Sequence, residues 1–264
     1  MKKQPLRVLY LVLILIFLYA PIFTLMVLSF NSGRSMGHWA GFSLHWYAEM
    51  FQDEDIMSAL LNTLIIALVS AATSTVIGTA ACLGIQKMSS KKRSVLLGLN
   101  NITLLNADIV TGISLMLTFV IFGISLSMGT VILAHITFCI PYVILSVMPK
   151  VKQLGMTQYE AALDLGASPA YAFFKITLPE LMPGISSGFL LAFTLSVDDF
   201  IVTHFTRGAG VNTLSTMIYG QVKVGIRPTI YALSTIVFIL VLILLLLANY
   251  RPGKNRESHS GGVL

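Results

Sequence analysis

Long runs without any charged residue constrain the fold of this chain more than any other feature of its sequence. Residues 8–30, 59–85 and 228–250 contain no Asp, Glu, Lys or Arg. The hydrocarbon core of a bilayer is about 30 Å thick, and a helix needs about 20 apolar residues to cross it. Each run is long enough to do so, and the sequence therefore predicts an integral membrane protein.

The composition excludes an ordinary soluble domain. Residues of the set AVILMFWYC make up 56% of the chain and charged residues 11%, whereas a typical soluble domain has about 25% charged residues. The formal net charge of +6 would suit a nucleic-acid partner, but the basic residues stand in short clusters between the apolar runs. There they fix membrane orientation, so we expect no nucleic-acid binding. Cys82 and Cys139 lie inside apolar runs and are expected to be buried free thiols.

Six transmembrane helices are predicted, at residues 8–30, 59–85, 96–122, 129–149, 184–205 and 228–250. They form one all-α membrane domain over residues 1–250, and a tail at 251–264 lacks apolar periodicity and is predicted to be disordered. Residues 123–129, rich in Gly and Ser, are the predicted turn between the third and fourth spans. A cleaved signal peptide is the alternative for residues 8–30, but the run is longer than a signal core and no small-residue cleavage site follows it.

The distribution of basic residues predicts the orientation. With both termini in the cytoplasm, four of the 17 basic residues fall on outside segments, namely Arg34, Arg207, Lys223 and Arg227. The others lie at the inside ends of the spans, as the positive-inside rule requires. We therefore expect both termini and residues 91–93 to face the cytoplasm, and residues 53–55 to face the outside.

The longest inside loop, residues 150–183, has the pattern of a helix–turn–helix. Thr157 and Glu160 have the spacing of a capping box that starts a short helix. Gly166 supplies the backbone freedom that ends it. Ser168 and Pro169 then start a second helix as N-cap and first helical residue.

A spaced signature runs through the same loop: Glu160-Ala161-Ala162, then Gly166, then Ile176-Thr177-Leu178-Pro179. It resembles the EAA motif of the permeases of binding-protein-dependent ABC importers. The resemblance implies a type I importer permease fold, in which this loop couples the chain to a cytoplasmic ATPase through Glu160, Ala161, Ala162, Gly166, Leu178 and Pro179. From the residues themselves, Leu178-Pro179 is expected to stop the second helix before the fifth span.

Three aspartates, Asp108, Asp198 and Asp199, fall within predicted spans. A carboxylate there costs about 2.5–3.5 kcal/mol on insertion scales and is a candidate for function. The spans hold no Lys or Arg, so protonation, hydrogen bonding, water, a partner subunit or a cationic cargo must stabilise these groups. Asp108 and Asp198 are expected at similar depth, from the midplane outward. Asp198 and Asp199 cannot both face one cavity in a regular helix, so one is a structural partner or the helix unwinds.

Residues 196–200, Ser-Val-Asp-Asp-Phe, also resemble the fifth span of the spermidine/putrescine branch of that family. The resemblance implies a polyamine cargo, which spaced carboxylates with aromatic walls would complement. Trp46 and Tyr219 are interface anchors or contacts to the cargo. His135 is expected to be hydrogen-bonded, and His204, at helical spacing from Asp199, to bond that residue.

The chain has no phosphate-binding loop, so ATP and Mg²⁺ are expected on partner ATPase subunits and no cofactor on this chain. The family resemblance implies a non-catalytic subunit of the bacterial inner membrane. It also implies three partners: cytoplasmic ATPase subunits, a second permease and a periplasmic binding protein. Two alternatives stay open: an importer permease for another small solute such as an amino acid, and a secondary transporter that uses Asp108 as an ion site.

Overall fold

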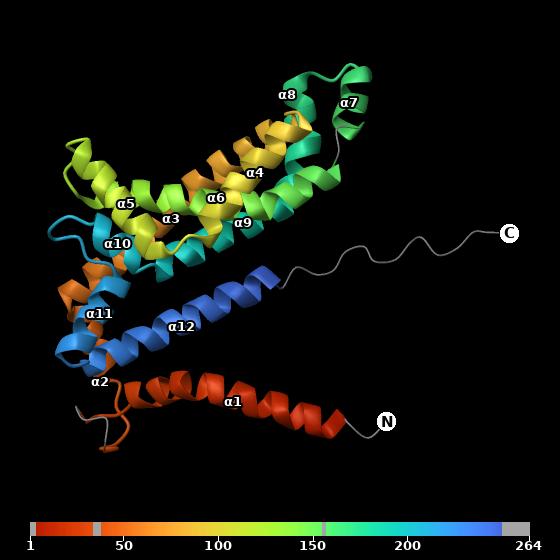
Figure 1. Ribbon diagram of the computed structural model, residues 1–264. Coiled ribbons are helices and arrows are strands. Elements are labelled where there is room, and N and C mark those ends of the chain that lie inside the picture. The colour runs from red at the N-terminus through yellow and green to blue at the C-terminus, as the bar shows by residue number, and fades with distance from the viewer. Residues whose placement is uncertain (1–3, 34–37, 155–156, 250–264) are drawn as a thin grey trace. The chain divides into compact units, whose positions relative to one another are not determined.

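The computed structural model describes residues 4–33, 38–154 and 157–249, which are almost entirely helical (Figure 1). In these residues the β structure is a single isolated bridge between Asn31 and Phe42. The predicted disordered tail lies outside the described residues. The chain divides into two compact units, one made of its N- and C-terminal parts and the other of Asp55–Gly220.

The first unit contains α1 (Gln4–Ser29), α2 (His45–Gln52) and α12 (Pro228–Asn249). Helix α12 packs against both α1 and α2. The side chains of α1 from Val8 onward are largely exposed, with Phe17 at 80%, although they are apolar. A helix that leaves such a surface uncovered suits a lipid environment, as the charge-free run predicts.

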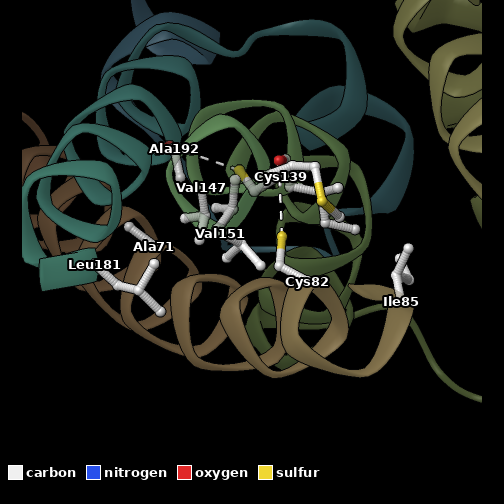
Figure 2. Packing of buried hydrophobic residues seen from close by; sticks show 11 residues of the cluster. Ala71, Cys82, Ile85, Cys139, Val147, Val151, Leu181 and Ala192 are labelled. Carbon is white, nitrogen blue, oxygen red and sulfur yellow. Dashed lines mark hydrogen bonds between the residues drawn. The ribbon is translucent and has the colours of Figure 1, made fainter. Parts of the chain in front are cut away.

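The second unit is built on three long helices, α3 (Glu54–Gln86), α6 (Met128–Leu154) and α9 (Leu178–Asp198). Figure 2 shows their buried side chains packed into one cluster. Cys82 donates to the Ile144 carbonyl over 3.7 Å and Cys139 to the Ala192 carbonyl over 3.6 Å. Both thiols are free and buried, as predicted.

The predicted third span is not one helix. Helix α4 (Ser90–Leu105) and helix α5 (Asp108–Ile121) meet at 104°, and Asn106 and Ala107 between them are extended, with ψ of 141° and 135°. The Asn106 side-chain amide donates to Thr111 Oγ1 over 3.0 Å. Asn side chains compete in this way with helical hydrogen bonds, and the apolar pattern of 96–122 did not reveal the break.

Four described helices are long and apolar enough to cross a membrane: Val8–Ser29, Glu54–Gln86, Met128–Leu154 and Pro169–Asp198. The bent pair α4 and α5 adds a fifth if it counts as one span, and Pro228–Ile243 is a shorter apolar helix. The turn expected at 123–129 is present between α5 and α6, with Gly123 at φ +68°. The count of six spans stays a prediction.

Candidate functional site

The chain breaks its helix at the pair of adjacent aspartates. Helix α9 ends at Asp198, and the short helix α10 (Ile201–Thr206) begins three residues later. Asp199 between them is extended, with ψ of 124°. The expected fifth span over 184–205 is therefore not regular, which agrees with one of the two alternatives, that the helix unwinds at the aspartates.

The Asp199 carboxylate caps α10. One oxygen accepts from the Val202 amide over 3.2 Å. The other accepts from the Thr203 amide over 2.8 Å and from the Thr203 hydroxyl over 3.0 Å. A carboxylate at a helix start satisfies amides that have no partner in the helix and is favoured by the helix dipole. Asp199 is thus a structural element of the break.

His135 of α6 fills the space beside this cap. Its side chain is 1% exposed. Nδ1 lies 2.6 Å from the Ser196 hydroxyl, and Nε2 lies 2.9 Å from the Thr203 hydroxyl and 3.4 Å from Oδ2 of Asp199. His135 therefore joins α6 to α9 and to α10 through side chains alone, and its expected hydrogen bonding is confirmed.

The prediction that His204 bonds Asp199 is wrong. Among the described residues, the carboxylate of Asp199 lies instead 3.4 Å from Nε2 of His135, which belongs to α6. The His204 ring instead stacks on Phe200, with centroids 5.2 Å apart, and meets Phe205 edge-on at 5.6 Å. The spans hold no Lys or Arg, and the partner of Asp199 is instead an imidazole on a different helix.

Asp198 is the last residue of α9. It is exposed, and no hydrogen bond or ion pair of its carboxylate is found among the described residues. Phe200 follows it and packs on Tyr219 of α11 (Leu214–Val224), with ring centroids 4.3 Å apart. The Tyr219 side chain is 43% exposed. At the break, the exposed Asp198 is therefore two positions in sequence from a ring that packs on Tyr219.

Asp108 is placed near α10 by close packing. It is the first residue of α5 and is exposed. One turn further on, Gly112 approaches α10 so closely that a Cβ there would lie 3.3 Å from the Val202 Cα and 3.2 Å from the Phe205 ring. Residues four apart share a helix face. Asp108 therefore lies one turn from the α5–α10 contact, although the depth expected from a straight span does not apply to a bent one.

Trp46 belongs to the other unit. Its indole is 4% exposed, and Nε1 donates to the Asn31 carbonyl over 2.6 Å. The side chain is therefore packed within its own unit. Its contact with cargo stays a prediction.

The predicted helix–turn–helix is present in the segment 150–183. Helix α7 (Thr157–Asp164) is followed by Gly166 at φ +87°, a conformation that suits glycine. The Gly166 amide donates to the Leu163 carbonyl over 2.9 Å, and the Ala167 amide to the Ala162 carbonyl over 3.0 Å. This is the Schellman ending of a helix. Glu160 and Ala161 are exposed and Ala162 is buried.

The second helix of the segment starts as predicted but does not end as predicted. Ser168 Oγ accepts from the Tyr171 amide over 3.3 Å, and Pro169 begins α8 (Pro169–Ala172). Leu178-Pro179 does not stop it. The chain continues through a π turn, η1 (Phe173–Thr177), directly into α9. Pro179 is tolerated there because it lies in the first turn of α9, where its missing amide would have no helical partner. The capping box rests on Thr157, whose side chain lies outside the described residues.

The chain belongs to the family of binding-protein-dependent transport system inner membrane components, which it matches over residues 84–251. It is similar to the putrescine transport system permease protein PotI of Escherichia coli strain K12, with 38% identity over 242 residues, 89% of this chain and 86% of PotI. It is similar as well to the spermidine/putrescine transport system permease protein PotC of the same strain. That identity is 34% over 247 residues, 94% of each chain.

A solved structure shares the fold. It is a bacterial ABC transporter involved in the import of the acidic polysaccharide alginate, and a chain of it superposes with a TM-score of 0.73 at 14% identity, over 95% of this chain and 98% of that one. The expected importer permease fold is therefore confirmed. The chain is a permease component of a transport system and a multi-pass membrane protein.

Proposed function

We propose that this permease forms half of the path by which an ATP-driven importer carries a polyamine across the membrane. The observation that carries the proposal is the exposed Asp198 at the helix break, two positions in sequence before Phe200, whose ring packs on Tyr219. Polyamine transport by PotI and PotC, relatives of this chain, supports it.

The chemistry of the break suits an extended polycation. A carboxylate forms charge-assisted hydrogen bonds with an ammonium group, and an aromatic face attracts a cation within about 6 Å of its centre. Asp108, near the α5–α10 contact, would meet a second ammonium group. The same carboxylates disfavour an anionic cargo, which would be repelled at close range.

The assembly follows from the same proposal. Both termini face the cytoplasm of a bacterial cell, six spans cross its inner membrane, and the 150–183 loop docks on ATPase subunits that carry ATP and Mg²⁺. Glu160, Ala161, Ala162, Gly166, Leu178 and Pro179 make or support that contact. A second permease completes the path, and a periplasmic binding protein delivers the cargo. The bilayer is the remaining partner, and the chain binds no nucleic acid.

The experiment measures uptake of radiolabelled putrescine and spermidine per assembled complex in cells. Asp198→Asn keeps size and removes charge, and Glu54→Gln, an exposed acid at the start of α3, is the matched control. Charged hydrogen bonds contribute about 1.5–3 kcal/mol, so uptake at low cargo concentration should fall by roughly 10- to 150-fold in Asp198→Asn. Unchanged uptake per complex would refute the proposal that Asp198 lies on a polyamine path.

Two controls separate the alternatives. Excess unlabelled amino acids should leave polyamine uptake unchanged, whereas competition by them would favour an amino-acid importer. Collapse of the ion gradient with ATP maintained should also leave uptake intact. Loss of uptake under that condition would favour a cation-coupled secondary transporter.

A further inference from the structure

Helix α4 has two opposite faces, and the described chain covers one of them. The covered face packs on α6 (Figure 1). It consists of half-buried residues at helical spacing: Arg93, Leu97, Asn100 and Leu104. The Asn100 side-chain amide donates to the Pro141 carbonyl over 3.3 Å and holds this contact. The opposite face carries a row of exposed apolar side chains, Val95, Leu99 and Ile102. In a membrane protein such an apolar face is suited to contact with lipid.

Two lysines stand at the start of this exposed face. Lys91 precedes Val95 by one helical turn and Leu99 by two, so the three share one side of the helix. Lys92 flanks them, since it precedes Val95 by three positions. Both lysines are exposed, and no ion pair of either is found among the residues that the structure describes. Residues 56–107 contain no Asp or Glu, and α6 contains none either. The positive charge at the start of α4 is therefore left for a partner.

The length of the exposed face and the order of its groups fit one phospholipid. The helical rise from Lys91 to Ile102 is roughly 16 Å, about half of a hydrocarbon core that is about 30 Å thick. Lysine stems lie along apolar surface while the ammonium groups stay at the water interface. A phospholipid presents the same order, with a phosphate at the interface and an acyl chain below it. A cytoplasmic protein would pair with the lysines alone, because the apolar row belongs to a segment apolar enough to cross the membrane.

We propose that this face of α4 binds an anionic phospholipid. The headgroup phosphate accepts from the ammonium groups of Lys91 and Lys92. An acyl chain lies along the row of Val95, Leu99 and Ile102. Basic residues next to a span attract anionic lipids, so a lipid with a net negative charge is favoured over a zwitterionic one. In the proposed orientation the lipid belongs to the cytoplasmic leaflet, and its binding is independent of the cargo.

The test compares the quenching of a tryptophan on this face by two brominated lipids. Leu99→Trp places the reporter in the apolar row, and the parent chain, with its two tryptophans, supplies the background. The purified chain, with the subunits that co-purify with it, is reconstituted in phosphatidylcholine nanodiscs. These contain equal fractions of either brominated phosphatidylglycerol or brominated phosphatidylcholine. The ratio of the two quenching curves gives the preference for the anionic lipid, because the acyl chains and their bromines are the same.

Leu68→Trp is the matched reporter. Leu68 is also exposed, but it lies on α3, 19 positions before Lys87 and thus roughly 28 Å away along the helix. Leu99→Trp should favour phosphatidylglycerol by about fivefold for each lysine that pairs with it, and Leu68→Trp should show no preference. Equal quenching by the two lipids at Leu99→Trp would overturn the proposal. The same preference at both reporters would also overturn it, since it would reflect the charge of the whole assembly.

Substitutions in the Leu99→Trp chain test the groups that hold the headgroup. Lys91→Gln together with Lys92→Gln should abolish the preference, whereas Arg93→Gln should retain it. Arg93 is the matched control because it belongs to the same basic turn but is half-buried on the packed face, where it donates to Gln86 Oε1 over 3.4 Å. A preference that persists in the double lysine variant, or that Arg93→Gln also abolishes, would overturn the proposal. Loss of the co-purifying ATPase with lipid preference retained would assign the lysines to a protein interface and would overturn it too.

Discussion

Replacing His135 with leucine should destabilise the permease and disable transport, because this imidazole holds the helix break together. The ring is 1% exposed and contacts Ser196, Thr203 and Asp199. Leucine removes these bonds and leaves the Ser196 hydroxyl buried without its partner. A lost bond to a charged group costs about 1.5–3 kcal/mol, and an unsatisfied buried group about 1–3 kcal/mol. We expect a loss of about 2.5–6 kcal/mol in unfolding free energy.

The assay is unfolding of the purified chain in mixed micelles with increasing SDS, followed by helical circular dichroism. His204→Leu is the matched control, since His204 is exposed and its ring only stacks on neighbouring aromatics. It should lose less than about 1 kcal/mol, as surface substitutions generally do. A double-mutant cycle of His135→Leu with Asp199→Asn should give a coupling energy of about 1–3 kcal/mol. Equal stability of the two histidine variants, or no coupling, would refute the reasoning.

Other predictions concern the remaining elements. Gly166→Val forces a residue with a Cβ into φ +87°, so it should cost about 1–2 kcal/mol and reduce co-purification of the ATPase, whereas Ala167→Val should not. Gly112→Leu collides with α10 and should lower the amount of folded protein in membranes, measured by immunoblot against a Gly98→Leu control with open space around it. A cysteine at position 54 should react with an impermeant maleimide in spheroplasts, and one at position 92 only after permeabilisation; the reverse would invert the topology.

The sequence predicted best where one physical effect dominates. Charge-free runs identified a membrane protein because no other environment accepts such surfaces. Gly166 and Ser168 predicted the turn within the segment 150–183 because left-handed backbone and helix caps have strong residue preferences. Such local rules depend on a few adjacent residues and need no knowledge of the rest of the fold.

Prediction from the sequence failed where contacts between distant segments determine the local structure. His135 and Asp199 are 64 positions apart in the chain, and no periodicity links them. The break at Asn106 depends on a side-chain bond to Thr111 that competes with helical bonding, while the apolar pattern continues across it. The continuation of the helix past Pro179 depends on a π turn, which hydrophobic pattern does not encode.

The two adjacent aspartates then have different physical tasks. Asp199 points its carboxylate at amides and a buried imidazole, all within the protein, so its charge is already compensated. Asp198 is exposed, and no hydrogen bond or ion pair of its carboxylate is found among the described residues. An uncompensated carboxylate in a membrane is costly, and residues of this kind mark functional sites at which a binding partner offsets the cost. In the function proposed above, a cation passing the break provides that offset, and the His135 cluster holds the backbone next to Asp198.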